Sequence, residues 1–390
     1  MRRPGRRFGS IAAAWLLASS SAVADTPADG LRGVLVTRSA RREGAIALRD
    51  GTLRVEGQAV PLDDLLMLGL RSPGWTLPPP NTVRLRNGEV WRCRIDSVSQ
   101  EGLEIASAML GRHRVPLRSV ERIEFAPGAP PERQPPPGSL FRAKGEPLRG
   151  QLLWVDAEQL AVDTNGPLGV LTLSRESIAG YRFRPPPPPQ TAAARRRDGH
   201  EVALIDGNIL HGRVAVMKDG FRLKHAVFGE LALRPGGVRS VVRQAEGVIY
   251  LGDLSPVEAS LTPLVTARAA GKAVRVIEPG GTHAPRFGFI RGVCIAGGGT
   301  VRYRAPLSRP ARFAAVVAPM GDARGAVRLR VLFGERLVVE KRLAPGGAAV
   351  EVAGEVRPGE QVTFEVQFTA PVRLPAGAVV CDGRWVEREP

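Results

Sequence analysis

One pattern recurs along the chain up to about residue 243 and restricts the fold more than any other feature. In three copies, repeating every 55 to 62 residues, a turn glycine is followed at a nearly fixed distance by a second glycine and a short apolar segment. Self-similarity at such a period is the sequence signature of a repeat architecture. The glycine pairs are Gly88 and Gly111, Gly145 and Gly169, and Gly207 and Gly229, with spacings of 23, 24 and 22 residues.

Each copy has the pattern of short β-strands joined by tight turns. Apolar and polar residues alternate, and the dipeptides Asn87-Gly88 and Asp206-Gly207 suit turns that need φ > 0. A unit of about 45 residues is marginal as a core of its own, so the copies are expected to pack together or to close into small barrels. The copies span residues 82–125, 138–183 and 200–243, and residues 33–71 form a degenerate first copy that ends in a short helical run to Leu70.

Proline-rich segments separate the copies. Residues 78–80, 127–137 and 185–189 predict stiff, extended spacers. The last spacer continues into the triple arginine 195–197, so residues 185–199 form a Pro/Arg-rich linker. The triple arginine is either a contact for a polyanion or a solvated, charged linker.

The strand order within one copy is similar to that of Sm-like small β-barrels. In the copy 82–125 an apolar strand, the Asn87-Gly88 turn and a bent strand are followed by Leu103-Glu104-Ile105 and a final strand that ends at Phe125. The resemblance implies a barrel shape for one copy at a time. The copies lack the N-terminal helix and the nucleotide-contacting residues of that family, so it implies no RNA binding.

From about residue 245 to residue 388 the pattern changes to longer alternating strands. The clearest is 362–368, whose alternate residues are apolar and would face one side of a core. Glycine and proline punctuate these strands at the spacing expected of a β-sandwich. The two parts together predict an all-β protein, with tandem small β-barrel-like repeats followed by a jelly-roll-like β-sandwich.

Six segments of the C-terminal part carry a second resemblance: Tyr250–Glu258, Arg291–Cys294, Thr300–Tyr303, Phe313–Val317, Gly325–Val331 and Cys381–Gly383. They make residues 245–388 look like the NPCBM family, the "novel putative carbohydrate-binding module". The resemblance implies a jelly-roll-like sandwich that binds glycans. Members commonly carry His-Ser where this chain has Ala296-Gly297, and a Gly-x-Asp where it has Ala318-Pro319-Met320, so the fold transfers more securely than the ligand.

A sugar site needs an aromatic face for the C–H surface of the ring and a few planar polar groups for the hydroxyls. In the C-terminal part the candidates for such ligand-binding residues are Arg291, Tyr303, Asp382 and Trp385. The competing interpretation is structural. Tyr303 alternates like a core residue of a strand, and Trp385 could close the end of the sandwich.

The N-terminus has the organisation of a cleavable signal peptide. Four arginines among the first seven residues precede an apolar stretch, 11–18, which is too short to span a bilayer of about 30 Å. Ala22 and Ala24 supply the small-x-small pattern of a cleavage site, so residues 1–24 are predicted to be removed. The mature chain is expected to be exported, to the periplasm, the cell envelope or the extracellular space, without a transmembrane anchor.

Charge alone does not identify a partner. The formal net charge is +17, and loss of the four leader arginines would leave about +13, which attracts polyanions. The skew toward arginine, with few lysines, is also what coding bias in a GC-rich genome produces. Together with the export signal this argues against nucleic acid.

The three cysteines are Cys93, Cys294 and Cys381, an odd number. An exported chain with three cysteines forms at most one disulfide and leaves one thiol over. Cys294 with Cys381 is the expected pair, because both residues fall in the C-terminal domain.

No catalytic pattern stands out. The histidines match no metal-ligand spacing, so neither a metal site nor a cofactor is predicted. Asp156, Glu158 and Asp163 are the carboxylates that best match a glycosidase pair, but a repeat of this size has no room for a cleft, and solvated turn residues are the favoured interpretation.

The sequence therefore predicts an exported, non-catalytic binding protein. Its C-terminal module would be carbohydrate-binding-like, and its repeat array would serve as a spacer or an interaction surface. The expected partners are a glycan or acidic polysaccharide and envelope proteins. The alternatives are a structural protein of envelope assembly without sugar binding, or an accessory subunit of a hydrolase complex.

Overall fold

The computed structural model describes residues 31–49, 52–71, 81–125, 135–142, 145–185, 199–261, 274–277, 289–369 and 376–388. Their regular elements are β-strands and short 3-10 helices, so the predicted all-β class is confirmed. In this part of the chain, no helix has the length and apolarity needed to cross a membrane. The predicted signal peptide and the triple arginine lie outside the described residues.

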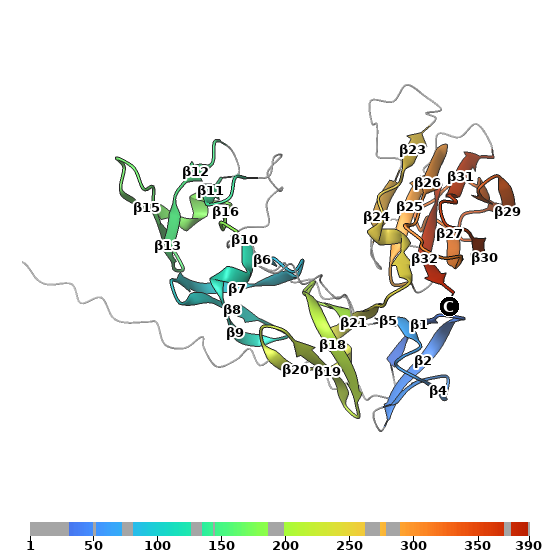
Figure 1. Ribbon diagram of the computed structural model, residues 1–390, viewed down its shortest axis with the longest axis horizontal. Helices are drawn as coiled ribbons and strands as arrows, with labels where there is room; N and C mark the ends of the chain where they lie inside the picture. The colour runs from blue at the N-terminus through green and yellow to red at the C-terminus, as the bar shows by residue number, and fades with distance from the viewer. Residues whose placement is uncertain are drawn as a thin grey trace, which may run out of the picture.

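The N-terminal array consists of four repeat units (Figure 1). Unit 1 contains β1 (Leu31–Thr37), β2 (Arg41–Arg49), β3 (Thr52–Val55), β4 (Gln58–Val60) and β5 (Leu65–Arg71). Unit 2 contains β6 (Asn81–Leu85), β7 (Val90–Ser99), β8 (Gly102–Ser107), β9 (Gly111–Val115) and β10 (Val120–Glu124). Unit 3 contains β11 (Ser139–Phe141), β12 (Leu148–Arg149), β13 (Gln151–Val155), β14 (Gln159–Asp163), β15 (Val170–Ser174) and β16 (Gly180–Arg182). Unit 4 contains β17 (Gly199–Leu204), β18 (Ile209–Met217), β19 (Gly220–His225), β20 (Gly229–Leu233) and β21 (Val238–Gln244).

All four units share one topology. The strands of a unit run as an antiparallel meander, and the last strand returns to pair with the first, as β5 does with β1 and β10 with β6. The second glycine of each sequence pair explains the regular spacing. Gly111, Gly169 and Gly229 have φ of 79°, 57° and 70°, so each occupies a left-handed turn position that favours glycine, at or just before the start of β9, β15 and β20.

The helical run predicted to end at Leu70 is wrong. Residues 65–71 form β5, which pairs with β1 on one side and with β21 of unit 4 on the other. Leu66, Met67 and Leu68 are fully buried, because β5 lies inside a sheet and both of its faces are covered. A continuous apolar run of this length fits a buried strand as well as a helix, and pattern alone does not separate them.

The units associate in pairs through their last strands. β5 of unit 1 pairs with β21 of unit 4, and β10 of unit 2 pairs with β16 of unit 3. One hydrophobic core runs through all four units, which is how repeats too small to fold alone bury enough apolar surface. The first and last units therefore lie side by side, and the array folds back on itself (Figure 1).

The C-terminal part is a sandwich of two sheets, which confirms the predicted sandwich architecture. One sheet contains β22 (Val248–Tyr250), β24 (Val274–Ile277), β25 (Gly292–Ala296), β27 (Ala311–Pro319), β30 (Val350–Val356) and β32 (Gly377–Glu387). The other contains β23 (Glu258–Leu261), β26 (Gly299–Tyr303), β28 (Val327–Phe333), β29 (Arg336–Leu343) and β31 (Val362–Phe368). Phe313 and Phe333 are among the buried side chains that fill the space between the sheets.

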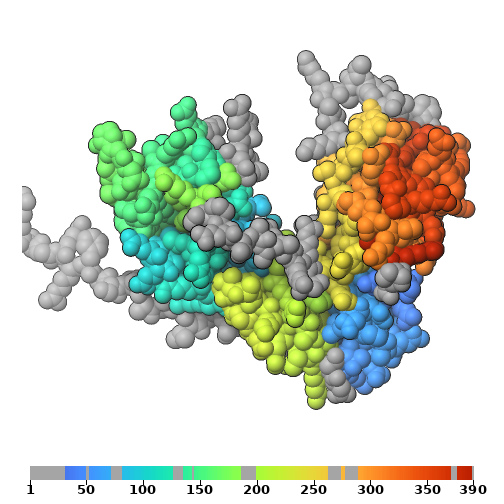
Figure 2. Space-filling model, viewed as in Figure 1, coloured from blue at the N-terminus to red at the C-terminus, as the bar shows by residue number. Residues whose placement is uncertain are grey.

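The sandwich packs against units 1 and 4 (Figure 2). An apolar cluster joins Met67 of unit 1 and Val242 of unit 4 to Tyr250 and Ile290 of the sandwich. The Tyr250 hydroxyl donates to the carbonyl oxygens of Arg243 (2.6 Å) and Leu66 (3.2 Å). The sandwich and the paired units 1 and 4 therefore share a buried interface rather than a free linker.

The predicted disulfide between Cys294 and Cys381 is not formed, and both thiols are free and buried. The two residues lie on neighbouring strands, but Cys294 stands opposite Val379 and Cys381 opposite Gly292, so they are offset along the ladder. Burial raises the pKa of the Cys294 thiol to about 11 and raises that of Cys381 well above its usual range. Both side chains act as small apolar groups in a packed cluster.

Candidate functional site

The two aromatic residues predicted to form a sugar platform lie in the core of the sandwich. Tyr303 is 1% exposed and Trp385 is 0% exposed. The Trp385 ring packs against Phe313, with 4.8 Å between ring centroids, and Tyr303 packs edge-on against Phe364. Neither ring presents a face to solvent, so the prediction of an aromatic platform from this pair is wrong. The strand alternation that made Tyr303 look like a core residue was the stronger signal.

The two polar residues of the same prediction lie where the sandwich meets the array. Asp382, in a left-handed backbone conformation (φ 52°), accepts hydrogen bonds from the backbone N–H groups of Ile290 (2.8 Å) and Arg291 (3.0 Å). Its other carboxylate oxygen lies 3.5 Å from Nε of Arg41, which belongs to unit 1. Burial raises the pKa of Asp382, although these contacts oppose the rise.

Arg291 makes a two-armed contact across the same boundary. Its guanidinium donates to Glu201 of unit 4 and to Asp253 of the sandwich, each at 2.6 Å, and lies over the Tyr250 ring. All four predicted sugar-binding residues therefore have internal partners. Arg291 and Asp382 hold the sandwich on the array, a role that no local sequence signal indicates because their partners are distant in the chain.

Sequence reasoning missed a cluster of polar side chains that continues from Arg291 into the array. We call it the polar joint, and it consists of Glu89 of unit 2, Glu201, His211 and His225 of unit 4, and Arg291 and Asp253 of the sandwich. Glu201 accepts from Arg291, and His211 lies between Glu201 (3.6 Å) and Glu89 (3.8 Å). The joint thus connects unit 2, unit 4 and the sandwich through charged groups.

Glu89 is the most deeply buried member of the polar joint, with no exposed surface. Its carboxylate accepts hydrogen bonds from Nε2 of His225 (2.8 and 3.0 Å), from the indole N–H of Trp91 (3.1 Å) and from the backbone N–H of His211 (2.9 Å). Nδ1 of His225 accepts from the backbone N–H groups of residues 227 and 228, so the ring proton is on Nε2 and points at Glu89.

The charges in the polar joint shift two pKa values in opposite directions. The close contact with Glu201 is the largest cause that raises the pKa of His211 above its ordinary 6.5, and the charge of Glu89 adds to it. Burial alone would raise the pKa of Glu201, but the hydrogen bonds and charges of His211 and Arg291 outweigh it and lower that pKa to about 2.

The polar joint should therefore be strongest between about pH 4.5 and 6.5. Because the pKa of His211 is raised, its contribution to the stability of the fold is complete below pH 6.5 and is lost as the pH rises through the raised value. Because the pKa of Glu201 is lowered, its contribution is complete above pH 4.5 and is lost as the pH falls toward 2. We expect His211→Gln to cost roughly 0.5–1 kcal/mol at pH 5.5, and less at pH 8.

The measurement is the denaturant midpoint of both proteins at a series of pH values. The informative quantity is the difference in midpoint between wild type and His211→Gln, because the titration of His200 changes the stability of both proteins in the opposite direction. Burial, followed by the charge of Arg243, lowers the pKa of His200 to about 4, so this residue favours the fold at higher pH. A difference between the proteins that grows from pH 5.5 to pH 8 would contradict the assignment to His211.

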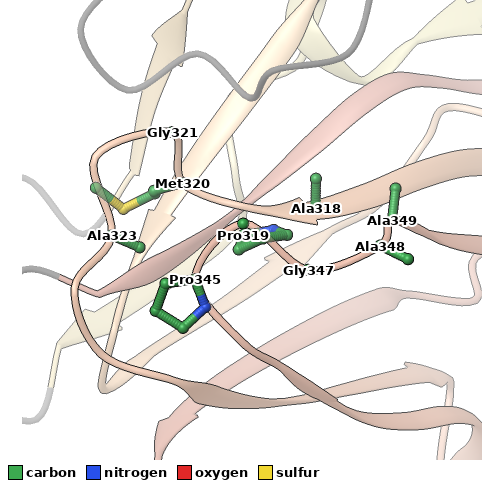
Figure 3. Close-up of a pocket in the computed structure, with 10 residues that line it drawn as sticks. Ala318, Pro319, Met320, Gly321, Ala323, Pro345, Gly347, Ala348 and Ala349 are labelled. Atoms are coloured by element: carbon green, nitrogen blue, oxygen red, sulfur yellow. The ribbon is translucent and has the colours of Figure 1, made fainter.

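The sandwich has a pocket of about 510 Å³ at one end (Figure 3). It lies between the end of β27 and the connection from β29 to β30, and Pro319, Met320, Pro345 and Ala348 are among its lining residues. β32 pairs with Pro319 at its beginning and contacts unit 1 through Arg384 near its end, so the pocket is at the end of the sandwich remote from the array. Its volume falls in the range of ligand pockets, about 300–1,000 Å³.

The lining of this pocket is made of alanine, glycine, proline and methionine. The lining residues drawn in Figure 3 have short side chains and the thioether of Met320; among these described residues none is aromatic and none carries a side-chain nitrogen or oxygen. Any polar ligand would have to be held by main-chain groups. In the part of the chain that the structure describes, no group of three or more His, Cys, Asp or Glu side chains is placed to hold a metal ion.

No protein-family model matches the chain, and neither does any curated protein. Among solved structures it is similar to CBM51 of Clostridium perfringens GH95 in complex with methyl-galactose, at 12% identity and a TM-score of 0.29, over 36% of this chain and 99% of that one. The tandem CBM51 modules of Sp3GH98 from Streptococcus pneumoniae match at 10% identity and 0.31, over 79% and 88%.

The CBM51-2 and INT domains of Clostridium perfringens ZmpB match at 12% identity and a TM-score of 0.30, over 49% of this chain. The match covers 38% of the ZmpB chain. These neighbours are carbohydrate-binding modules by name, and likeness at this level says nothing about a ligand of the present chain.

Proposed function

We propose that this chain is an exported, non-catalytic binding protein whose C-terminal sandwich takes a glycan and whose repeat array holds that sandwich in place. The observation that carries the proposal is the pocket at the free end of the sandwich, opposite the end that is seated on the array. The NPCBM-like pattern of residues 245–388 and the signal-like N-terminus support a glycan and an exported location.

A structural role in envelope assembly, without sugar binding, is the second candidate. It is favoured by the described lining residues of the pocket, none of which has a side-chain nitrogen or oxygen, and by the internal partners of Arg291 and Asp382. In this case the module would keep its fold and lose its ligand.

The test is binding of the full mature chain to an array of neutral and acidic polysaccharides. Ala348→Trp would fill the pocket, because Ala348 is an exposed lining residue, and it should lower the affinity for the bound glycan roughly tenfold or more. Ala353→Trp is the matched control, since Ala353 is exposed on β30 outside the pocket. Binding of no polysaccharide by the wild type would refute the sugar role and leave the structural candidate.

A further inference from the structure

Unit 3 presents an aromatic side chain that is partly exposed to solvent. Trp154 is 37% exposed, whereas the other tryptophans and tyrosines that the structure describes, at positions 91, 181, 250, 303 and 385, are at most 4% exposed. The apolar surface of an indole ring stabilises a protein or a complex only when it is removed from water, and the exposed part of Trp154 is removed from water only if a ligand covers it. The position of this ring therefore needs an explanation.

A β-bulge turns Trp154 outward. β13 pairs with β14 so that Leu152 faces Val162 and Val155 faces Leu160, both toward the core, and the register shifts by one residue between Leu152 and Trp154. In a regular strand of the same sequence, alternation from Leu152 would place Trp154 in the core and Val155 in solvent. Bulges re-aim side chains in this way and are frequent beside binding sites.

The same bulge occurs in unit 2 with a different residue at the outward position. There β7 shifts register between Ile95 and Ser97, so Ser97 occupies the place of Trp154. Around Ser97 the outer face carries Arg94, Glu104 and Arg112. The fold of the repeat therefore does not require an aromatic residue at this position. Units 2 and 3 share the bulge and differ in the side chain that it turns outward.

The face around Trp154 combines polar and apolar side chains with one carboxylate. The three-stranded register places Ala161 and Thr172 in line with Trp154, and Gln151, Asp163 and Val170 in the next row. Ala161 is 1% exposed although it lies outside the core cluster, as expected where the indole covers it. The planar indole of Trp154 therefore lies on the same face as the amide of Gln151, the hydroxyl of Thr172 and the carboxylate of Asp163.

The local charge selects among ligands. From residue 150 to residue 174 there is no lysine or arginine, although Arg149 and Arg175 bound this range and Arg175 donates to the carbonyl oxygen of Asp156. The three carboxylates of the range outnumber the one arginine beside them, which disfavours a polyanion. A neutral, hydroxyl-rich ligand can accept and donate hydrogen bonds with glutamine and threonine and stack its C–H face on the indole.

We propose that the outer face of β13, β14 and β15, centred on Trp154, binds a neutral glycan. This inference shares with the proposed function the class of ligand and differs from it in the site. The face lies in unit 3, at the end of the array remote from the sandwich (Figure 2), so it is independent of the pocket in the sandwich. A protein that docks on the exposed apolar side chains of the hairpin between β14 and β15 is the other occupant that the test must separate.

The experiment titrates neutral polysaccharides and their oligosaccharides against the full mature chain and follows both affinity and tryptophan emission. Trp154→Ala should reduce the affinity at least tenfold, and Trp154→Tyr should restore most of it, because a smaller ring still stacks. Binding should also shift the emission of the wild type to shorter wavelength, and that shift should be absent in Trp154→Phe. Leu168→Ser is the matched control, because Leu168 is 64% exposed on the same hairpin and lies off the strand face.

The outcomes separate this inference from the proposed function. Loss of binding in Trp154→Ala with normal binding in Ala348→Trp and Leu168→Ser supports the face in unit 3. Loss in Ala348→Trp alone overturns the inference and leaves the proposed function standing, whereas a wild type that binds no glycan overturns both. Equal loss in Leu168→Ser and Trp154→Ala overturns it, because the effect would then not depend on the strand face.

Discussion

Replacement of Glu89 by alanine is expected to lower the free energy of unfolding by about 3–5 kcal/mol, because several buried hydrogen-bond donors lose their acceptor at once. Glu89 has no exposed surface, and its carboxylate accepts from two histidines and Trp91. Without it the N–H groups of His225, Trp91 and the His211 backbone would remain buried with no acceptor, and each orphaned group costs about 1–3 kcal/mol.

Urea unfolding followed by tryptophan fluorescence measures this effect, since the Trp91 indole donates directly to Glu89. Glu101→Ala is the matched control. Glu101 is in the same unit and is ion-paired with Arg114, but both side chains are at least half exposed, so the expected cost is under about 1 kcal/mol. A similar loss in both variants would show that burial of the Glu89 carboxylate does not matter for stability.

Trp385→Ala is expected to destabilise the sandwich by about 3–5 kcal/mol, as for other large aromatic residues deleted from a core. The ring is completely buried between Phe313 and the rest of the core, so its loss leaves a cavity that the neighbours cannot fill. Its indole N–H has no hydrogen-bond partner among the described residues. Trp385→Phe should therefore cost much less, because it keeps a ring and removes an unsatisfied donor.

The same variant separates a core residue from a sugar-binding residue. At a temperature where it is folded, Trp385→Ala should bind any glycan as the wild type does, because the ring touches no surface. Trp154→Ala should show the reverse, with glycan binding lost and stability lowered by only about 1–2 kcal/mol, because the indole is partly buried and covers Ala161. A Trp385→Ala protein of normal stability that had lost glycan binding would restore the original interpretation of Trp385 as a ligand platform.

Much of the fold could be predicted from local pattern. The turn glycines at 88, 111, 207 and 229 have the left-handed backbone that the repeat spacing required, because no other residue adopts it at so little cost. Alternation likewise identified the strands of the sandwich. The error at residues 65–71 arose where alternation was absent, since a strand buried on both faces has no polar side to show.

The candidate site was much less predictable. Arg291, Asp382, Tyr303 and Trp385 were chosen for their chemistry, and their chemistry is used for internal contacts. Glu89 and Trp154 were overlooked because nothing near them in the sequence marks them. Glu89 acquires its role from residues of unit 4 more than a hundred positions away, and Trp154 acquires its exposure from a one-residue register shift.

The sequence by itself determined that this chain is built from small β units and a sandwich, because strand alternation and turn glycines are local properties of the backbone. Only the tertiary structure decided that unit 1 pairs with unit 4 and that the sandwich is seated on both. Alternation states which residues share a face of a strand. Whether that face meets solvent, a core or another unit depends on which distant edges and surfaces come together, and that pairing is what buried Tyr303 and Trp385 and left Trp154 outside.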